Sequence, residues 1–131
     1  MVLTKMSSAA TEVKIWELQD LSSLPTWVRG RAILIGDAAH AMTPMQGQGA
    51  NMSIEDAEAF RLLRSGVMRE AVPEILNKIE GLRKKRVDKI LEETRKAHEA
   101  KDVEARFKAN EELYYGYEGI LAAISKEEEG A

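Results

Sequence analysis

The apolar run AILI, residues 32–35, is the feature that most constrains the fold of this chain of 131 residues. Gly30 and Gly36 bound the run, and no polar residue interrupts it. Such a run is typical of a strand that is buried on both faces. A strand of that kind belongs to a sheet that helices cover on both sides, so the α/β class is predicted.

The N-terminal part of the chain predicts only short elements. Residues 2–10, VLTKMSSAA, have the composition of a short helix end. In residues 11–18, TEVKIWEL, apolar and charged residues alternate, which favours a short strand. Residues 20–30 are expected to form a connector because Pro25 interrupts both the helical and the strand periodicity. The chain therefore offers one further strand to pair with residues 32–35.

Two helices are predicted after the strand. Residues 50–65 are helix formers without a break, and their apolar members fall on every side, which favours a helix packed on several sides. Gly66 is expected to end it, and Pro73 suits the first turn of the next helix. About 25 residues at about 1.5 Å each would give a helix nearly 40 Å long, which is longer than the core of so small a domain needs. We therefore expect this helix to pack against a larger protein body. Its apolar stripe comprises Leu76, Ile79, Val87, Ile90, Thr94 and Ala97.

Two clusters near the C-terminus have competing interpretations. The run LRKKR, residues 82–86, could form a nucleic-acid patch, but apolar residues and acidic residues interleave with it, which favours helix packing. Tyr114, Tyr115 and Tyr117 could stack on a ring, but an aromatic plug against the core is favoured. The charged residues that follow are expected to form a frayed tail.

Composition excludes several kinds of site. The chain has no cysteine, which rules out disulfides, thiolate metal sites and a cysteine nucleophile. His40 and His98 lie too far apart in sequence for metal-ligand spacing. The net charge of -3 provides no basic field for nucleic acid, and no apolar run approaches the roughly 20 residues of a membrane span. The N-terminus lacks a secretory apolar core, so a cytoplasmic or other intracellular location is expected.

A candidate ligand site follows the strand. Asp37 stands at its C-terminal end and would be an acceptor-only carboxylate, suited to sugar or sugar-alcohol hydroxyls. Gly47 and Gly49 would let the backbone approach a planar ligand, and the first amides of the helix that begins at Ala50 would donate toward it. The implied ligand is polyhydroxylated and electron-rich at one edge. In the competing interpretation, Asp37 is a cap and the glycines are turn residues.

The stretch RAILIGDAAHAMTPMQGQGANMSIEDAEAF, residues 31–60, resembles the second flavin-binding motif of the FAD-dependent aromatic hydroxylases, in particular the salicylate-hydroxylase-like monooxygenases. The GD of that motif falls on residues 36–37, its AAH on residues 38–40, its proline on Pro44 and its GQG on residues 47–49. The resemblance extends more weakly on both sides and covers most of the chain.

The resemblance implies FAD as the cofactor, NAD(P)H as its reductant and an aromatic small molecule as the substrate of the parent enzyme. It also implies that the aspartate meets the ribityl hydroxyls and that the flavin ring lies against the proline and the GQG loop. No catalytic side chain and no metal ligand is expected, because oxygen transfer is flavin chemistry; His40 is expected to pack or to bond to the backbone rather than act as a base. The implied cofactor-binding residues are Gly36, Asp37, Pro44, Gly47, Gln48, Gly49, Ala50 and Asn51.

The resemblance covers only the C-terminal third of such an enzyme, because the GxGxxG turn that holds the adenosine diphosphate does not occur in this sequence. The expected organisation is one fragment of a Rossmann-like FAD-binding domain over residues 1–131, with a strand and connector (1–30), the flavin motif (31–66) and a helical region (67–131). Alone, the chain is expected to be mainly helical with a small, poorly covered sheet remnant, marginally stable and inactive, because residues 13–18 are the only other strand available to pair with residues 32–35. A complementing chain could carry the missing half. The alternative is a non-catalytic helical interaction module that keeps the motif only as structure.

Overall fold

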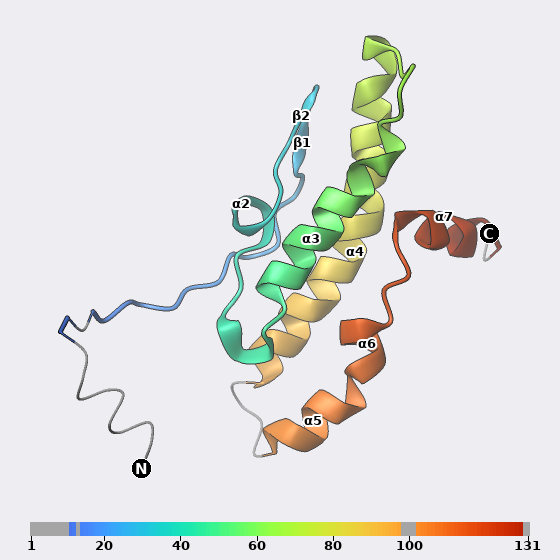
Figure 1. Ribbon diagram of the computed structural model, residues 1–131. Helices are drawn as coiled ribbons and strands as arrows, with labels where there is room; N and C mark the ends of the chain where they lie inside the picture. The colour runs from blue at the N-terminus through green and yellow to red at the C-terminus, as the bar shows by residue number, and fades with distance from the viewer. Residues whose placement is uncertain (1–10, 13, 98–101, 130–131) are drawn as a thin grey trace.

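The computed structural model describes residues 11–12, 14–97 and 102–129. Within them the chain is mainly helical, with one small two-stranded sheet (Figure 1). The long helix α4 (Val72–Ala97) runs beside α3 (Gly49–Ala59), and the sheet and the C-terminal helices flank this pair. None of the helices in the described residues combines the length and the apolar character needed to cross a membrane.

The sheet is an antiparallel hairpin of β1 (Val28–Arg29) and β2 (Ala32–Ile33), with the first residue of β1 opposite the last residue of β2. The prediction that residues 32–35 form a strand buried on both faces is therefore wrong, whereas the small, poorly covered sheet remnant expected of the isolated chain is confirmed. Leu34 and Ile35 lie beyond the pairing and are 42% and 45% exposed. No further strand in the described part of the chain extends the sheet past them, so no neighbouring strand completes the burial of their side chains.

The strand predicted over residues 11–18 is not formed in its described part either. Residues 14–18 are irregular, and Ile15 and Trp16 are 98% and 78% exposed. Alternating residues become a strand only when another strand pairs with them, and this segment has no such partner in the described structure. Val13 and the helix end predicted for residues 2–10 lie outside the described residues.

The connector predicted over residues 20–30 is irregular at first but contains β1. Several hydrogen bonds fasten it to the rest of the chain, among them contacts of Arg95 with Asp20 and of Lys84 with Ser23. The Leu21 amide donates to the Ala41 carbonyl at 2.8 Å, and the Trp27 amide donates to Glu80 Oε1 on α4 at 2.8 Å. Trp27 itself is buried, so the end of this connector belongs to the core.

The residues of the motif form three short elements in succession. A one-turn helix, α2 (Asp37–His40), follows β2, and a 3₁₀ turn (Pro44–Gln46) lies within the predicted loop. Helix α3 then begins at Gly49 and passes into a second 3₁₀ turn (Phe60–Leu62). The predicted helix over residues 50–65 is thus confirmed up to the change of helix type after Ala59.

The prediction of a long amphipathic helix is confirmed by α4, which a 3₁₀ turn (Arg69–Ala71) precedes. Pro73 lies in its first turn, where the missing amide hydrogen costs no intrahelical bond. All six residues of the predicted apolar stripe are buried. Helix α4 contributes residues to both apolar clusters of the core. The buried residues of the first cluster are Trp27, Ala39, Met52, Val87, Ile90 and Leu91. Those of the second cluster are Ala59, Leu76, Ile79 and Ile120.

The C-terminal region consists of α5 (Val103–Ala109), α6 (Glu111–Tyr115) and α7 (Ile120–Glu129). Asp102 caps α5 by accepting the Ala105 amide at 2.9 Å. The charged tail that was predicted to be frayed is helical up to the end of α7, where like charges are offset by the ion pair between Lys126 and Glu118. Figure 1 shows these helices lying along one side of α3 and α4.

Candidate functional site

The turn that joins β2 to α2 depends on Gly36. Its φ of 57° lies in the left-handed region, which glycine adopts without steric cost. A Cβ at this position would stand 3.1 Å from Ser53 Oγ, so the turn lies directly against α3. The Gly36 carbonyl accepts the amides of Ala39 and His40, both at 2.9 Å, and these bonds close α2. Asp37 is the first residue of α2 and is exposed.

The start of α3 presents backbone donors close to this turn. Gln48, the N-cap residue, makes no side-chain capping bond, and the first bond of the helix runs from the Met52 amide to the Gln48 carbonyl at 2.9 Å. The amides of residues 49–51 therefore precede the helical hydrogen-bond ladder. A helix N-terminus of this kind stabilises negative charge by about 0.3–1 kcal/mol. Ser53 follows by one turn, so the donor-bearing end of α3 adjoins the turn that carries Asp37.

The eight residues predicted to bind a cofactor fall into two segments, residues 36–37 and residues 44–51. Gly47 ends the 3₁₀ turn with a φ of 63°, a conformation that favours glycine. Gln48 is buried, and its side chain is used within the loop: Oε1 accepts Asn51 Nδ2 at 3.2 Å and Nε2 donates to the Gln46 carbonyl at 3.3 Å. Pro44 and Ala50 are exposed. The side chain of Gln48 therefore stabilises this loop from within, whereas Pro44 and Ala50 are exposed to solvent.

A buried carboxylate that sequence analysis missed lies beneath the turn. Asp56 of α3 is 2% exposed. Its Oδ2 accepts the Gly36 amide at 2.9 Å and His40 Nε2 at 2.7 Å. Its Oδ1 accepts Arg83 Nε from α4 at 3.0 Å. One side chain thus joins the turn before α2, the end of α2 and the long helix.

His40 is a buried structural residue in this arrangement. Its ring centroid lies 5.5 Å from that of Trp27, which confirms the expected packing, but its hydrogen-bond partner is the Asp56 side chain rather than the backbone. An ionised carboxylate can only accept, so Nε2 carries the proton in this bond. His40 Nδ1 has no hydrogen-bond partner in the described structure. The described residues contain no group of three or more His, Asp and Glu side chains that could hold a metal ion.

We expect Asp56 to titrate below the usual range of an aspartate. Burial alone would raise its pKa, but hydrogen bonds from His40, the Gly36 amide and Arg83 together outweigh burial and lower the pKa. A lowered pKa stabilises the fold above the unfolded value of about 3.9, and this contribution is lost as the pH falls through the folded value. The test is an acid titration of the Asp56 carboxyl carbon followed by NMR, and a midpoint at or above about pH 4 would contradict the assignment.

The charge network continues from Asp56 along α4. Arg83 is 1% exposed and also donates to Glu55 and, from Nη2, to the Met52 carbonyl at 3.2 Å. Arg86 holds both oxygens of Glu55, from Nε at 2.7 Å and from Nη2 at 2.9 Å. The prediction that the LRKKR run packs as part of a helix is correct, but the buried ion pairs of Arg83 and Arg86 were not predicted. The sequence did contain one sign of them: Glu55 and Asp56 are adjacent carboxylates in a helix that was predicted to be packed on several sides, where a buried charge needs a partner.

One tyrosine of the C-terminal segment, Tyr117, contacts the arginines of this network. Tyr114 is buried, as the predicted aromatic plug requires, whereas Tyr115 is 60% exposed and does not belong to it. The Tyr117 ring lies over the guanidinium groups of Arg83 and Arg86, 5.2 and 5.0 Å from their central carbons. Burial raises the pKa of Tyr117 to about 12, so its hydroxyl stays protonated and donates to Glu58 Oε2 at 3.2 Å.

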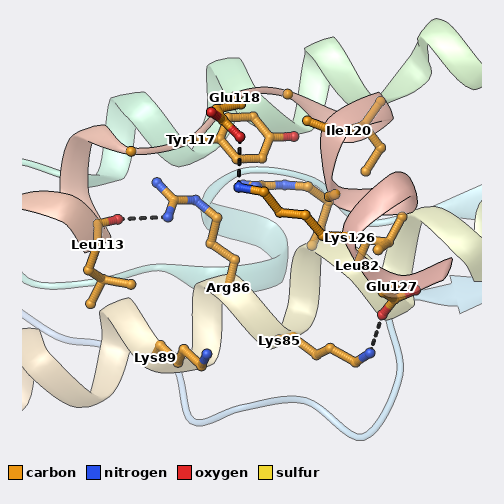
Figure 2. Close-up of a pocket in the computed structure, with 15 residues that line it drawn as sticks. Leu82, Lys85, Arg86, Lys89, Leu113, Tyr117, Glu118, Ile120, Lys126 and Glu127 are labelled. Atoms are coloured by element: carbon orange, nitrogen blue, oxygen red, sulfur yellow. Dashed lines mark hydrogen bonds and ion pairs between the residues drawn. The ribbon is translucent and has the colours of Figure 1, made fainter. Parts of the chain in front are cut away.

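A cavity of about 380 Å³ separates α4 from the segment that contains α6 and α7 (Figure 2). Arg86 Nη1 donates across it to the Leu113 carbonyl at 2.7 Å. Most of the other charges at its rim are paired with one another, as the contacts of Lys126 with Glu118 at 2.7 Å and of Lys85 with Glu127 illustrate. The bonds of Arg86 and Lys85 fasten the C-terminal segment to α4, whereas the pair of Lys126 and Glu118 lies within that segment.

Comparison with known families assigns the chain to a class. A family model described as FAD binding domain matches residues 3–94, which is more than half of the chain. The chain therefore belongs to the FAD binding domain family.

The individual relatives to which the chain is similar include salicylate hydroxylases and FAD-dependent monooxygenases. A salicylate hydroxylase of Pseudomonas putida is 40% identical over 93 residues, which cover 67% of this chain and 21% of the relative. An FAD-dependent monooxygenase of Arthrinium sp. is 38% identical over 99 residues, 75% of this chain and 24% of the relative. A solved structure of a salicylate hydroxylase substrate complex matches 72% of this chain and 26% of its own, with a TM-score of 0.62 and 38% identity. The chain thus spans about a fifth to a quarter of the curated relatives.

Proposed function

We propose that this chain supplies the flavin-side contacts of an FAD site in a monooxygenase that hydroxylates an aromatic compound. The observation that carries the proposal is the exposed Asp37 on a turn that packs against the uncapped start of α3. A carboxylate accepts from hydroxyl groups and helix amides donate to an electron-rich edge, so the two together fit a ribityl chain attached to a flavin ring. Membership of the FAD binding domain family and the monooxygenase relatives support the choice of FAD.

Each residue of the proposed site has a limited task. Asp37 would accept the ribityl hydroxyls, and the amides of residues 49–51 would donate to the ring edge that gains negative charge on reduction. Pro44 and Gly47 would give the ring a flat contact surface, and Gly36 would keep the turn free of a side chain. When bound, FAD would supply the redox chemistry and the oxygen activation, with NAD(P)H as the reductant. The side chains of this chain would therefore bind and orient the cofactor.

We further propose that β2 and its continuation, residues 32–35, form one strand of a larger, Rossmann-like parallel sheet in the whole protein. Leu34 and Ile35 continue the sequence of β2 and are half exposed, which is unusual for a run of this composition. The segment 14–18 exposes further large apolar side chains. A polypeptide with a strand, a GxGxxG turn and a helix would cover this surface and would hold the pyrophosphate, for which this sequence has no such turn.

The competing function is a non-catalytic helical interaction module. The observation that favours it is the apolar surface itself, since Ile15, Trp16, Leu34 and Ile35 could serve a protein partner without any flavin. The two functions differ in a property that is easily measured. A flavin site gives a yellow protein or a saturable change in flavin fluorescence, whereas an interaction module gives neither.

We expect the isolated chain to bind FAD with a Kd weaker than about 10 µM, because one half-site with two or three charge-assisted hydrogen bonds supplies only about 4–6 kcal/mol. Asp37→Ala should weaken this binding at least about tenfold, the value of one such hydrogen bond. Flavin fluorescence during titration of the purified chain measures both. NAD(P)H oxidation with salicylate-like phenols should be absent.

Asp37→Asn is the matched control, because it keeps the shape and one acceptor oxygen but removes the charge. Its affinity should fall between those of the wild type and Asp37→Ala. Equal FAD affinity in all three proteins would contradict the role of Asp37. Saturation of the wild type at micromolar FAD would contradict the half-site, and a chain without any flavin response that captures a protein partner would favour the interaction module.

A further inference from the structure

The helix that carries Asp37 is too short to hold its own shape. α2 has four residues, whereas isolated helices of fewer than about 12 residues are marginal in water. Its internal bonds are those that the Gly36 and Asp37 carbonyls accept, at 2.9 to 3.2 Å. Its conformation must therefore be imposed by groups outside it.

Asp56 is the group that imposes it. A single oxygen, Oδ2, binds the Gly36 amide before the first residue of α2 and the His40 ring on its last residue. The two bonds, at 2.9 and 2.7 Å, hold the start and the end of the turn against one rigid point on α3. The left-handed φ of Gly36 is fixed in the same way, because its amide and its carbonyl are both engaged. Asp37, which follows directly, receives its backbone direction from this clamp.

Asp56 is itself held from α4. Arg83 Nε binds the other oxygen of the carboxylate, and the Arg83 guanidinium is fixed in turn by Glu55 and the Met52 carbonyl. Asp56 is 2% exposed and Arg83 is 1% exposed, so water does not compete for these bonds. The carboxylate therefore has no freedom to rotate away from α2.

We propose that Asp56 is a positioning residue for the cofactor site. It clamps both ends of α2 and thereby sets the direction in which Asp37 presents its carboxylate to the flavin. His40 acts in the same clamp as the hydrogen-bond donor to Oδ2. The part of the inference that concerns the flavin rests on the function proposed above, whereas the clamp itself can be tested without any ligand.

The first test compares His40→Gln with His40→Leu in the flavin-free chain. Glutamine places an N–H donor near the position of His40 Nε2, and leucine has a comparable size without a donor. The hydrogen-exchange rates of the backbone amides of residues 39 and 40 measure the stability of α2. The exchange rate of the Ile90 amide in α4 measures the stability of the whole fold. We expect His40→Leu to lose protection in α2 at least about tenfold more than in α4, and His40→Gln to keep it.

A second measurement leaves the clamp residues unchanged. The ¹⁵N spectrum of the imidazole groups should show a protonated Nε2 on the His40 ring, and His98→Gln identifies which of the two histidine signals belongs to it. A His40 ring protonated only on Nδ1, or α2 protection unchanged in a folded His40→Leu protein, would overturn the clamp.

Flavin titration of the same proteins tests the positioning role. His40→Leu and Asp56→Asn should weaken FAD binding about tenfold, and His40→Gln should stay close to the wild type. Wild-type affinity in His40→Leu despite a loosened α2 would overturn the positioning role and leave the proposed function standing. If the wild type gives no saturable response to FAD, the proposed function fails, and the exchange and imidazole measurements still decide the clamp.

Discussion

Replacing Arg83 by methionine should lower the free energy of unfolding by about 3–5 kcal/mol, because it removes the shared cation of a buried network. The Arg83 guanidinium donates to Asp56, to Glu55 and to the Met52 carbonyl, and the residue is 1% exposed. Methionine fills much of the same space but donates nothing. Asp56 would retain its bonds from α2 but would lose the guanidinium of Arg83. Urea unfolding followed by helical circular dichroism measures the change.

Lys85→Met is the matched control for this substitution. Lys85 belongs to the same run of α4, but its side chain is 71% exposed and its ion pair with Glu127 lies at the surface. Exposed pairs of this kind contribute little, so the change should stay within about 0.5 kcal/mol. Equal urea midpoints for the two variants would mean that the buried network does not stabilise the fold.

The parts of the fold that depend on local patterns were predictable from the sequence. The stripe from Leu76 to Ala97 recurs at helical spacing over many turns, and every one of its six residues is buried. Pro73 lies in the first turn of α4, as its local sequence predicts. The helix that was expected to end at Gly66 ends earlier, because α3 passes into a 3₁₀ turn that ends at Leu62. The motif around Asp37 was likewise readable, because the order of strand end, carboxylate, glycine loop and helix start is local.

The burial of the strand was not predictable from the same local signals. Residues 32–35 have the composition of a strand buried on both faces, but burial requires neighbouring strands that lie elsewhere in a polypeptide. The described chain pairs only the first two of these residues, and Leu34 and Ile35 remain half exposed. The alternating segment over residues 11–18 failed for the same reason. The composition of a segment shows which of its side chains could be buried. Whether they are buried depends on a neighbouring strand that pairs with the segment.

The buried charge network was hidden for another reason. Asp56 and Arg83 are 27 residues apart in sequence, and nothing in the pattern of charges states which acid meets which base. No partner for Glu55 or Asp56 was predicted from the sequence, and the LRKKR run was predicted to pack as part of a helix, with no acid named as its partner. Their pairing depends on α3 and α4 lying side by side, which is a tertiary fact. His40 shows the same limit: its packing was predicted, but its carboxylate partner was not.

The largest expected effect on function comes from completing the proposed site. In a chimera, the residues of this chain would replace the matching segment of the salicylate hydroxylase of Pseudomonas putida, to which they are 40% identical. The chimera would join this chain to the remainder of such an enzyme, in which the family resemblance places the site for the pyrophosphate and the adenosine. We expect it to bind FAD at least about 100-fold more tightly than the isolated chain, because the second half-site binds at a high effective concentration.

The chimera should be yellow after gel filtration and should oxidise NAD(P)H with formation of hydroxylated product from salicylate, whereas the isolated chain should do neither. Asp37→Ala in the chimera should weaken FAD binding at least about tenfold, and Lys85→Met should leave it unchanged. A chimera that is folded by circular dichroism, elutes as a single species and is colourless would show that the residues of this chain cannot form their half of a flavin site. Equal FAD affinity with and without Asp37 would instead assign the cofactor contacts to other residues of the motif, with the backbone amides of residues 49–51 as the next candidates.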